Sequence, residues 1–271
     1  MIDTKVRDAE LIEMQVREAG FPWEMLDPRV ILGPEPRRDA APSKMPVAVV
    51  QGIPGLGARA ESELAASDIT FLRAMFWSVE SVDGVAQDRV HPNDSAVQAA
   101  LLAAVLANAA AGAVRLEVEE TVHQGFFTTS TKTKVRLEAT GSEPTWPNRG
   151  LERSMIDALG AGRQATLEDV VSGWIGTESP DPQGQAAKRV TGQMVSRGVL
   201  VHRRVQHKAL WVFEWTADHY MVPERTKAQL GLEPVLPGRE QQWTQPLVYR
   251  AMEKDINQAF TRRTEVSDSY D

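Results

Sequence analysis

An unusually apolar stretch runs through the middle of an otherwise charged chain. Between Ala99 and Val114, sixteen residues include a single polar side chain, Asn108, and more than half of the sixteen are alanine. As a helix, this stretch would rise about 24 Å, whereas the hydrocarbon core of a bilayer is about 30 Å thick. We therefore predict a buried central helix and not a transmembrane span.

The ends and the periodicity of this stretch support the same interpretation. Asp94 is a suitable N-cap, and Gly112 suits the position just beyond the last helical turn. Larger apolar residues recur between them at helical spacing, and the alanines allow neighbouring elements to approach closely. These larger residues are Val97, Leu101, Leu102, Val105 and Leu106.

Beyond Gly112 the periodicity changes from that of a helix to that of a strand. Val114, Leu116 and Val118 alternate with charged residues, which is typical of a half-buried strand. The threonine-rich segment 125–140 extends this strand into a hairpin, and 199–215 has the pattern of a second hairpin. Helical patterns cover 68–79, 150–160, 166–176, 184–198 and 247–260, and a turn-rich link joins the first of them to the central helix.

The distribution of proline and glycine suggests how the chain is divided. Residues 1–65 are predicted to form an extended N-terminal arm rich in these two residues, which begins with a charged helical segment. Residues 66–222 form the domain, and 223–271 form a C-terminal loop and an amphipathic helix. We therefore expect a mainly α fold: one helical domain around the Ala/Leu-rich central helix, with two β-hairpins and the arm.

Composition and motifs argue against several classes of site. The chain has no cysteine, which excludes disulfides and thiolate chemistry. No two of the five histidines lie at i, i+4 with a glutamate between them, and neither G-x-S-x-G nor G-x-G-x-x-G occurs. We predict no metal, no cofactor and no enzymatic activity. The charged N-terminus lacks the apolar region of a secretory signal, so we expect a cytoplasmic protein.

One segment reverses the net charge of −7 that the whole chain carries. Residues 184–208 contain six basic residues and no acid, and aromatic residues follow at once. The candidate surface residues here are Lys188, Arg189, Arg203, Arg204, Lys208, Trp211 and Phe213. Three interpretations remain open: a solvated face balanced by acids elsewhere, a surface that contacts an anionic membrane, and a winged helix that reads nucleic acid through 184–198.

The order of these segments resembles the Golgi phosphoprotein family over about residues 66–222. "ITFLRAMFWSVESVDG" is similar to the opening helix of that family, and "ND", a long apolar helix and "GAVRLE" follow as they do there. "LERSMIDALG", "ATLEDVVSGWI" and "MVSRGVL" before an apolar hairpin match later segments. The resemblance implies a mainly helical domain that, in eukaryotes, binds phosphatidylinositol 4-phosphate at the Golgi surface and packages glycosyltransferases.

The residues that hold the lipid in that family are not matched in this chain. Pro92 stands in place of its tryptophan, and Leu101, Gly184 and Ala187 stand in place of its arginines. Recognition of phosphatidylinositol 4-phosphate is therefore not carried over. Arg189 and the basic hairpin remain as a looser surface for anions.

These observations together predict a non-enzymatic peripheral membrane or adaptor protein at the inner face of the membrane. Its expected partners are an anionic membrane surface, and a protein partner or a second copy of the chain held through residues 1–65. The alternatives are a winged-helix regulator that binds nucleic acid, which the net charge disfavours, and a structural subunit of a protein assembly.

Overall fold

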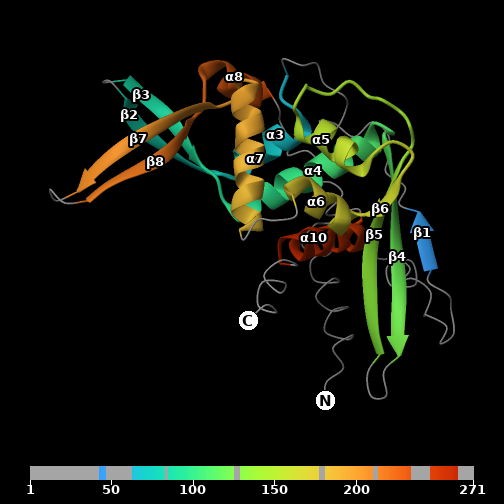
Figure 1. Cartoon of the computed structure of the whole chain (residues 1–271). Helices are drawn as coiled ribbons and strands as arrows, with labels where there is room; N and C mark the ends of the chain where they lie inside the picture. Colours follow the sequence, from blue (N-terminus) through green and yellow to red (C-terminus); the bar gives the residue numbers. More distant parts are fainter. Residues whose placement is uncertain are drawn as a thin grey trace, which may run out of the picture. The chain divides into compact units, whose positions relative to one another are not determined.

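Figure 1 shows the computed structural model of the chain, which describes residues 43–46, 63–82, 85–124, 129–176, 181–209, 213–232 and 245–261. All of these residues belong to one compact unit, Pro42–Asp271. The helical segment predicted at the start of the chain and most of the predicted N-terminal arm lie outside the described residues.

The predicted central helix is confirmed as α4 (Asp94–Ala110). Its N-cap is Asn93 and not Asp94, because the side-chain oxygen of Asn93 accepts the N–H of Ala96 at 2.8 Å. Gly112 has a φ of +74°, a conformation that glycine adopts at little cost and that ends the helix as predicted.

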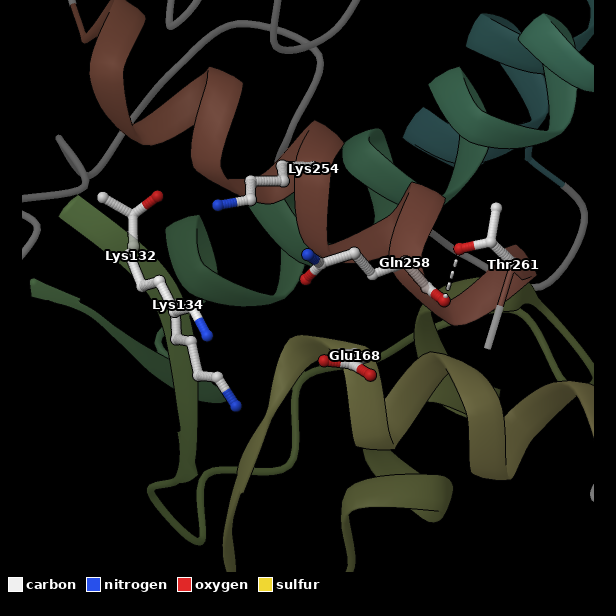
Figure 2. Close-up of a pocket in the computed structure, with 7 residues that line it drawn as sticks. Lys132, Lys134, Glu168, Lys254, Gln258 and Thr261 are labelled. Atoms are coloured by element: carbon white, nitrogen blue, oxygen red, sulfur yellow. Dashed lines mark hydrogen bonds between the residues drawn. The ribbon is translucent and has the colours of Figure 1, made fainter. Parts of the chain in front are cut away.

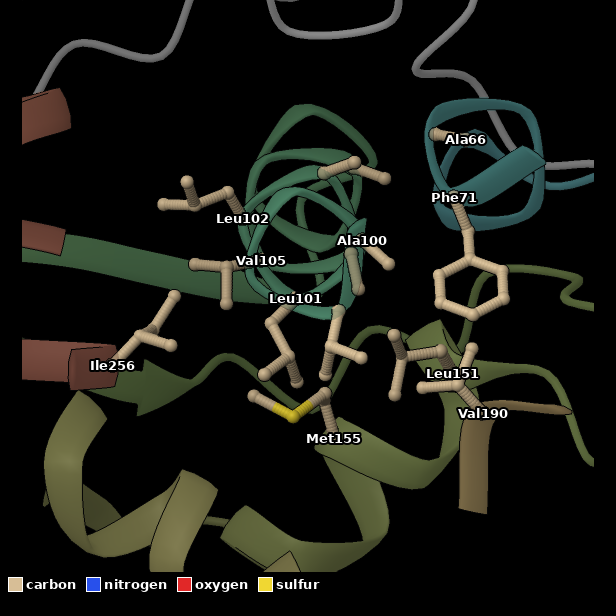
Figure 3. Packing of buried hydrophobic residues seen from close by; sticks show 14 of the residues in the cluster. Ala66, Phe71, Ala100, Leu101, Leu102, Val105, Leu151, Met155, Val190 and Ile256 are labelled. Carbon is tan, nitrogen blue, oxygen red and sulfur yellow. The ribbon is translucent and has the colours of Figure 1, made fainter. Parts of the chain in front are cut away.

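The core forms where other helices pack against α4. These are α3 (Ala66–Ala74), α5 (Leu151–Leu159), α7 (Pro182–Ser196) and α10 (Pro246–Thr261). Figure 3 shows Phe71, Met155 and Ile256, from three of these helices, around the leucines of α4. Asn108, the polar exception in the apolar stretch, donates its side-chain amide to the backbone carbonyl of Glu152 at 2.9 Å and so links α4 to α5.

The first sheet is antiparallel, with the strand order β1-β4-β5-β6. Its strands are β1 (Ser43–Pro46), β4 (Val114–Gln124), β5 (Thr129–Ala139) and β6 (Gln164–Thr166). The predicted alternation is confirmed, because Leu116 and Val118 are buried, as are Val135 and Leu137 on β5. Helices α10 and α6 (Leu167–Ile175) pack against β5. β1 lies within the predicted arm and pairs with β4 of its own chain.

The second sheet is also antiparallel, with the strand order β2-β3-β8-β7. Its strands are β2 (Phe76–Val82), β3 (Val85–His91), β7 (Val201–Ala209) and β8 (Phe213–Met221), and α8 (Glu224–Leu232) follows β8. In Figure 1 the far ends of these strands extend away from the helices. The predicted hairpin over 199–215 is present as β7–β8 and continues to Met221.

The expectation of a mainly α fold with two hairpins is wrong, because the chain is an α/β mixture with two four-stranded antiparallel sheets. The error lies between Phe76 and His91. The helix predicted over 68–79 ends at Ala74, and the expected link is the hairpin β2–β3. Aromatic and β-branched residues favour a strand here, and an Asp-Gly pair between two valines is a strong hairpin signal.

None of the helices in the described ranges combines the length and the apolar character that crossing a bilayer requires.

Candidate functional site

The structure divides the basic segment between a helix and two faces of a strand. Lys188 and Arg189 are exposed on α7 and form no ion pair within the described residues. Arg203 and Arg204 are adjacent on β7 and so point to opposite faces of the second sheet. The sequence-predicted residues therefore do not form one continuous basic face.

An acid on the neighbouring strand offsets part of this charge. Arg204 pairs in register with Asp218, and its Nε lies 3.4 Å from the Asp218 carboxylate. The same carboxylate oxygen lies 2.8 Å from Nε2 of His202, and this contact lowers the pKa of Asp218. The Lys208 and Phe213 side chains, and all of Trp211, lie outside the described part of the chain.

A second group of basic residues, which the sequence did not single out, surrounds a hollow of about 390 Å³. We call it the lysine pocket, and Figure 2 shows how it opens between β5, the start of α6 and α10. Its lining consists of Lys132, Thr133, Lys134, Glu168, Lys254, Gln258 and Thr261. All three lysines are exposed, and none forms an ion pair or a hydrogen bond within the described ranges.

Local geometry explains why these side chains share one space. Lys132 and Lys134 are two residues apart on β5 and therefore lie on the same face of the strand. Lys254 and Gln258 are four residues apart on α10 and lie on the same side of that helix. The "TKTK" pattern was a readable signal for the first pair, but nothing local connects it to Lys254.

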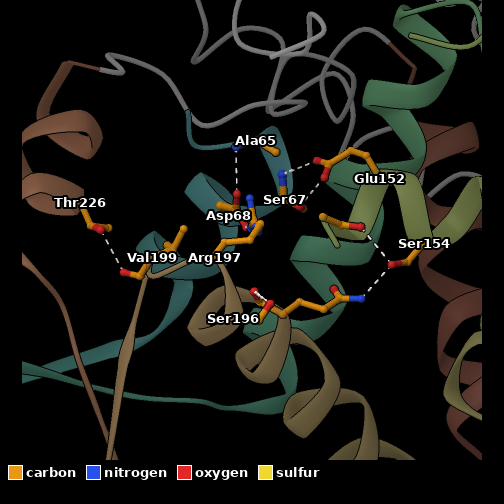
Figure 4. Close-up of polar contacts among 11 residues, drawn as sticks. Ala65, Ser67, Asp68, Glu152, Ser154, Ser196, Arg197, Val199 and Thr226 are labelled. Atoms are coloured by element: carbon orange, nitrogen blue, oxygen red, sulfur yellow. Dashed lines mark hydrogen bonds and ion pairs between the residues drawn. The ribbon is translucent and has the colours of Figure 1, made fainter. Parts of the chain in front are cut away.

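A buried polar network joins α3, α5 and α7 (Figure 4). The N–H and the hydroxyl of Ser67 each donate to one carboxylate oxygen of Glu152, both at 2.9 Å. Arg197, at the end of α7, forms an ion pair with Asp68, and both side chains are less than a tenth exposed. Asp68 also accepts the N–H of Ala65 and so caps α3. This network fixes the helices, and Glu152 within it is fully buried.

The environment of Glu152 makes the stability of the protein depend on pH. Burial, followed by the charge of Asp68, raises the pKa of Glu152 from 4.5 to about 7, although the hydrogen bonds from Ser67 oppose this rise. Because the folded state holds the proton more tightly, the contribution of Glu152 to stability is complete below pH 4.5. It is lost as the pH rises through 7.

The free energy of unfolding of the wild type should therefore fall by about 3 kcal/mol between pH 4.5 and 8. Glu152→Gln has no carboxyl group to titrate at this position, so we expect this fall to be absent from the variant. The glutamine can keep both contacts, since its oxygen accepts from the N–H of Ser67 and its amide donates to the hydroxyl. Urea unfolding of both proteins across this range measures the difference. Glu143→Gln, at an exposed glutamate, is the control, and an identical pH slope for wild type and Glu152→Gln would contradict the assignment.

A histidine cluster lies on one face of the second sheet. The Ser78 hydroxyl is 2.9 Å from Nε2 of His91, and Nδ1 of the buried His219 is 2.8 Å from the Glu80 carboxylate. Burial, with the charges of Arg89 and His219, lowers the pKa of His91 and so favours the neutral form of its ring. Within the described residues no carboxylate forms a hydrogen bond with the other ring nitrogen of His91. Ser78 and His91 therefore lack the acid that would complete a catalytic Ser-His-Asp triad there.

Across the described parts of the chain, no three histidine or acidic side chains come together as a metal site would require. Comparisons with protein-family models, curated proteins and solved structures gave no match to the chain. Function must therefore be argued from the surfaces and pockets themselves.

Proposed function

We propose that this protein is a non-enzymatic peripheral membrane protein that attaches to an anionic bilayer through the second sheet and α7. The observation that carries the proposal is a set of exposed apolar side chains on this sheet, with Phe76 and Val201 on one face and Val79 on the other. Phe76 is 68% exposed, Val79 71% and Val201 44%, and Leu247 is the one other large apolar residue that is similarly exposed among the described residues. Exposed apolar side chains in one region favour contact with a membrane or a partner.

The register of the β7–β8 hairpin adds to this support. Its last pair is Ala209 with Phe213, so the three residues that connect the strands are Leu210, Trp211 and Val212. A hairpin with an apolar connection and basic residues along its arms suits the boundary between headgroups and acyl chains. The resemblance to the Golgi phosphoprotein family, whose hairpin contacts membranes, agrees with this orientation.

The charges of the described residues indicate how strong the attachment would be. Arg204 is offset by Asp218, which leaves Arg203, Lys188 and Arg189 as the basic side chains that face no ion-pair partner among the described residues. Each basic residue near an anionic surface contributes about 1 kcal/mol. We therefore expect weak binding that decreases as salt rises, since the Debye length is about 8 Å at physiological ionic strength.

Co-sedimentation with phosphatidylserine vesicles tests this function. The wild-type protein should bind these vesicles at low salt and should not bind purely zwitterionic ones. Phe76→Ser, and separately Lys188→Glu with Arg189→Glu, should each reduce the bound fraction severalfold without unfolding the domain, because these side chains are exposed. Arg115→Glu with Arg153→Glu makes the same change in charge on other elements and should leave binding unchanged.

The same variants also separate the membrane proposal from the winged-helix alternative. Helices α6 and α7 and the β7–β8 hairpin follow one another as in a winged helix, but β6 pairs with β5 and not with the hairpin. Binding to duplex DNA at low salt, lost in Lys188→Glu with Arg189→Glu and unaffected by Phe76→Ser, would overturn the membrane proposal. Absence of vesicle binding in the wild type would overturn it as well.

A further inference from the structure

The side chains that line the lysine pocket carry a net positive charge. Three lysines and one glutamate line it, which leaves a net charge of +2 on its walls in a chain of net charge −7. Lys132, Lys134 and Lys254 form no ion pair among the described residues. Ammonium groups around one hollow repel each other, and an anion between them would remove that repulsion.

A buried hydrogen bond fixes the two walls of the pocket to each other. The Val135 N–H on β5 donates to Oδ2 of Asp255 on α10 at 2.8 Å, and Asp255 is 1% exposed. Val135 directly follows Lys134, and Asp255 directly follows Lys254. The bond therefore holds the backbone of both lysines in place. Figure 2 shows Lys134 and Lys254 on different elements beside the hollow. A site on a strand and a helix that are joined in this way is pre-organised.

We propose that the lysine pocket binds a phosphomonoester group. Such a group carries between about −1.5 and −2 charges at neutral pH, which matches the net charge of the lining. Its three terminal oxygens can accept hydrogen bonds from three ammonium groups, and lysine binds phosphate as a point charge. The lining residues include no aromatic or large aliphatic side chain, so recognition rests on the charged group.

The size of the pocket and its neutral donors fit a small phosphorylated compound. A volume of about 390 Å³ lies within the range of small-molecule sites. Gln258 and Thr133 can add hydrogen bonds to hydroxyl groups beside the phosphate. The same phosphate chemistry is offered by a soluble sugar or polyol phosphate and by the headgroup of phosphatidic acid, and the two sources need separate experiments.

Glu168 provides a test in which the substitution should strengthen phosphate binding and not weaken it. Its carboxylate lines the same pocket and would repel the phosphate. Removing the charge in Glu168→Gln should therefore strengthen binding, whereas removing a lysine should weaken it. A non-specific basic surface would show the loss with lysine removal but would not depend on this particular acid.

Isothermal titration of the full-length chain with glycerol 3-phosphate at low salt is the first experiment. Lys134→Gln and Lys254→Gln should each weaken binding about tenfold or more. Glu168→Gln should strengthen it about threefold or more. Lys188→Gln makes the same change in charge on α7 and should leave the affinity unchanged. Wild-type affinity in both the Lys134→Gln and the Lys254→Gln variants would overturn the proposal.

Vesicles with phosphatidic acid, compared with phosphatidylserine vesicles of equal surface charge, test the lipid source. A preference for phosphatidic acid that disappears in the combined variant Lys134→Gln with Lys254→Gln assigns the site to a headgroup. Binding of glycerol 3-phosphate without that preference assigns it to a soluble ligand, and binding of neither probe overturns the proposal. The inference is independent of the membrane function, because Phe76→Ser should bind glycerol 3-phosphate like the wild type.

Discussion

Replacing Leu102 with aspartate should lower the free energy of unfolding by several kcal/mol, a large part of the stability of a typical domain. Leu102 is 3% exposed on α4, within the core cluster shown in Figure 3. An aspartate at this position would place a charge among the apolar side chains of that cluster. Thermal and urea unfolding measure the loss.

Two further variants test whether the loss of stability in Leu102→Asp comes from burying a charge or from changing the shape of the side chain. Leu247→Asp makes the same substitution at a leucine that is 60% exposed on α10, and it should change stability by less than about 0.5 kcal/mol. Leu102→Met keeps the volume of the side chain and should cost less than about 1.5 kcal/mol. Wild-type stability in Leu102→Asp would mean that α4 is not the centre of the core.

The second large effect is expected at the ion pair between Arg197 and Asp68. Arg197→Met should destabilise the protein by about 3–5 kcal/mol, because it leaves the Asp68 carboxylate buried without a counter-ion. Arg197 is already only partly satisfied, since its Nε and Nη1 have no hydrogen-bond partner in the described structure. The loss of stability in Arg197→Met therefore arises more from the buried, unpaired Asp68 carboxylate than from the hydrogen bonds that Arg197 no longer makes.

A double-mutant cycle with Asp68→Asn isolates this effect. The asparagine oxygen can still accept the Ala65 N–H, so the cap of α3 survives while the charge is removed. The combined variant should then recover much of the stability lost in Arg197→Met alone. Arg153→Met breaks an exposed pair with Asp157 and should cost less than about 1 kcal/mol. Equal costs for Arg153→Met and Arg197→Met would contradict the burial argument.

The elements that the sequence predicted correctly are those whose signals are local. For α4, the apolar spacing and the stop at Gly112 lie within the helix or next to it. Thr166 opens α6 by accepting the Asp169 N–H, at the start of the helical pattern predicted over 166–176. The alternation after Val114 and the β7–β8 hairpin are also short-range patterns, since a period of two places one set of side chains on the buried face.

The β2–β3 hairpin shows where local pattern was insufficient. The apolar run from Ile69 to Val79 fits one face of a long helix as well as a helix followed by a strand. Distant contacts support the second arrangement, because β3 pairs with β8, more than a hundred residues further along. The indole N–H of Trp77 also donates to the carbonyl of Leu72 at 2.7 Å, where the chain turns from helix to strand.

The sequence by itself determined the buried central helix, the alternating strands after it, and the concentration of basic residues near 184–208, because each depends on neighbouring residues. Only the tertiary structure decided which charges remain unpaired. Register sets Arg204 beside Asp218, and the packing of both α3 and α7 on α4 brings Arg197 to Asp68. The packing of α10 on β5 brings Lys254 to Lys134. Charge interactions act through space, so the chemistry of these sites follows from packing that brings distant segments together.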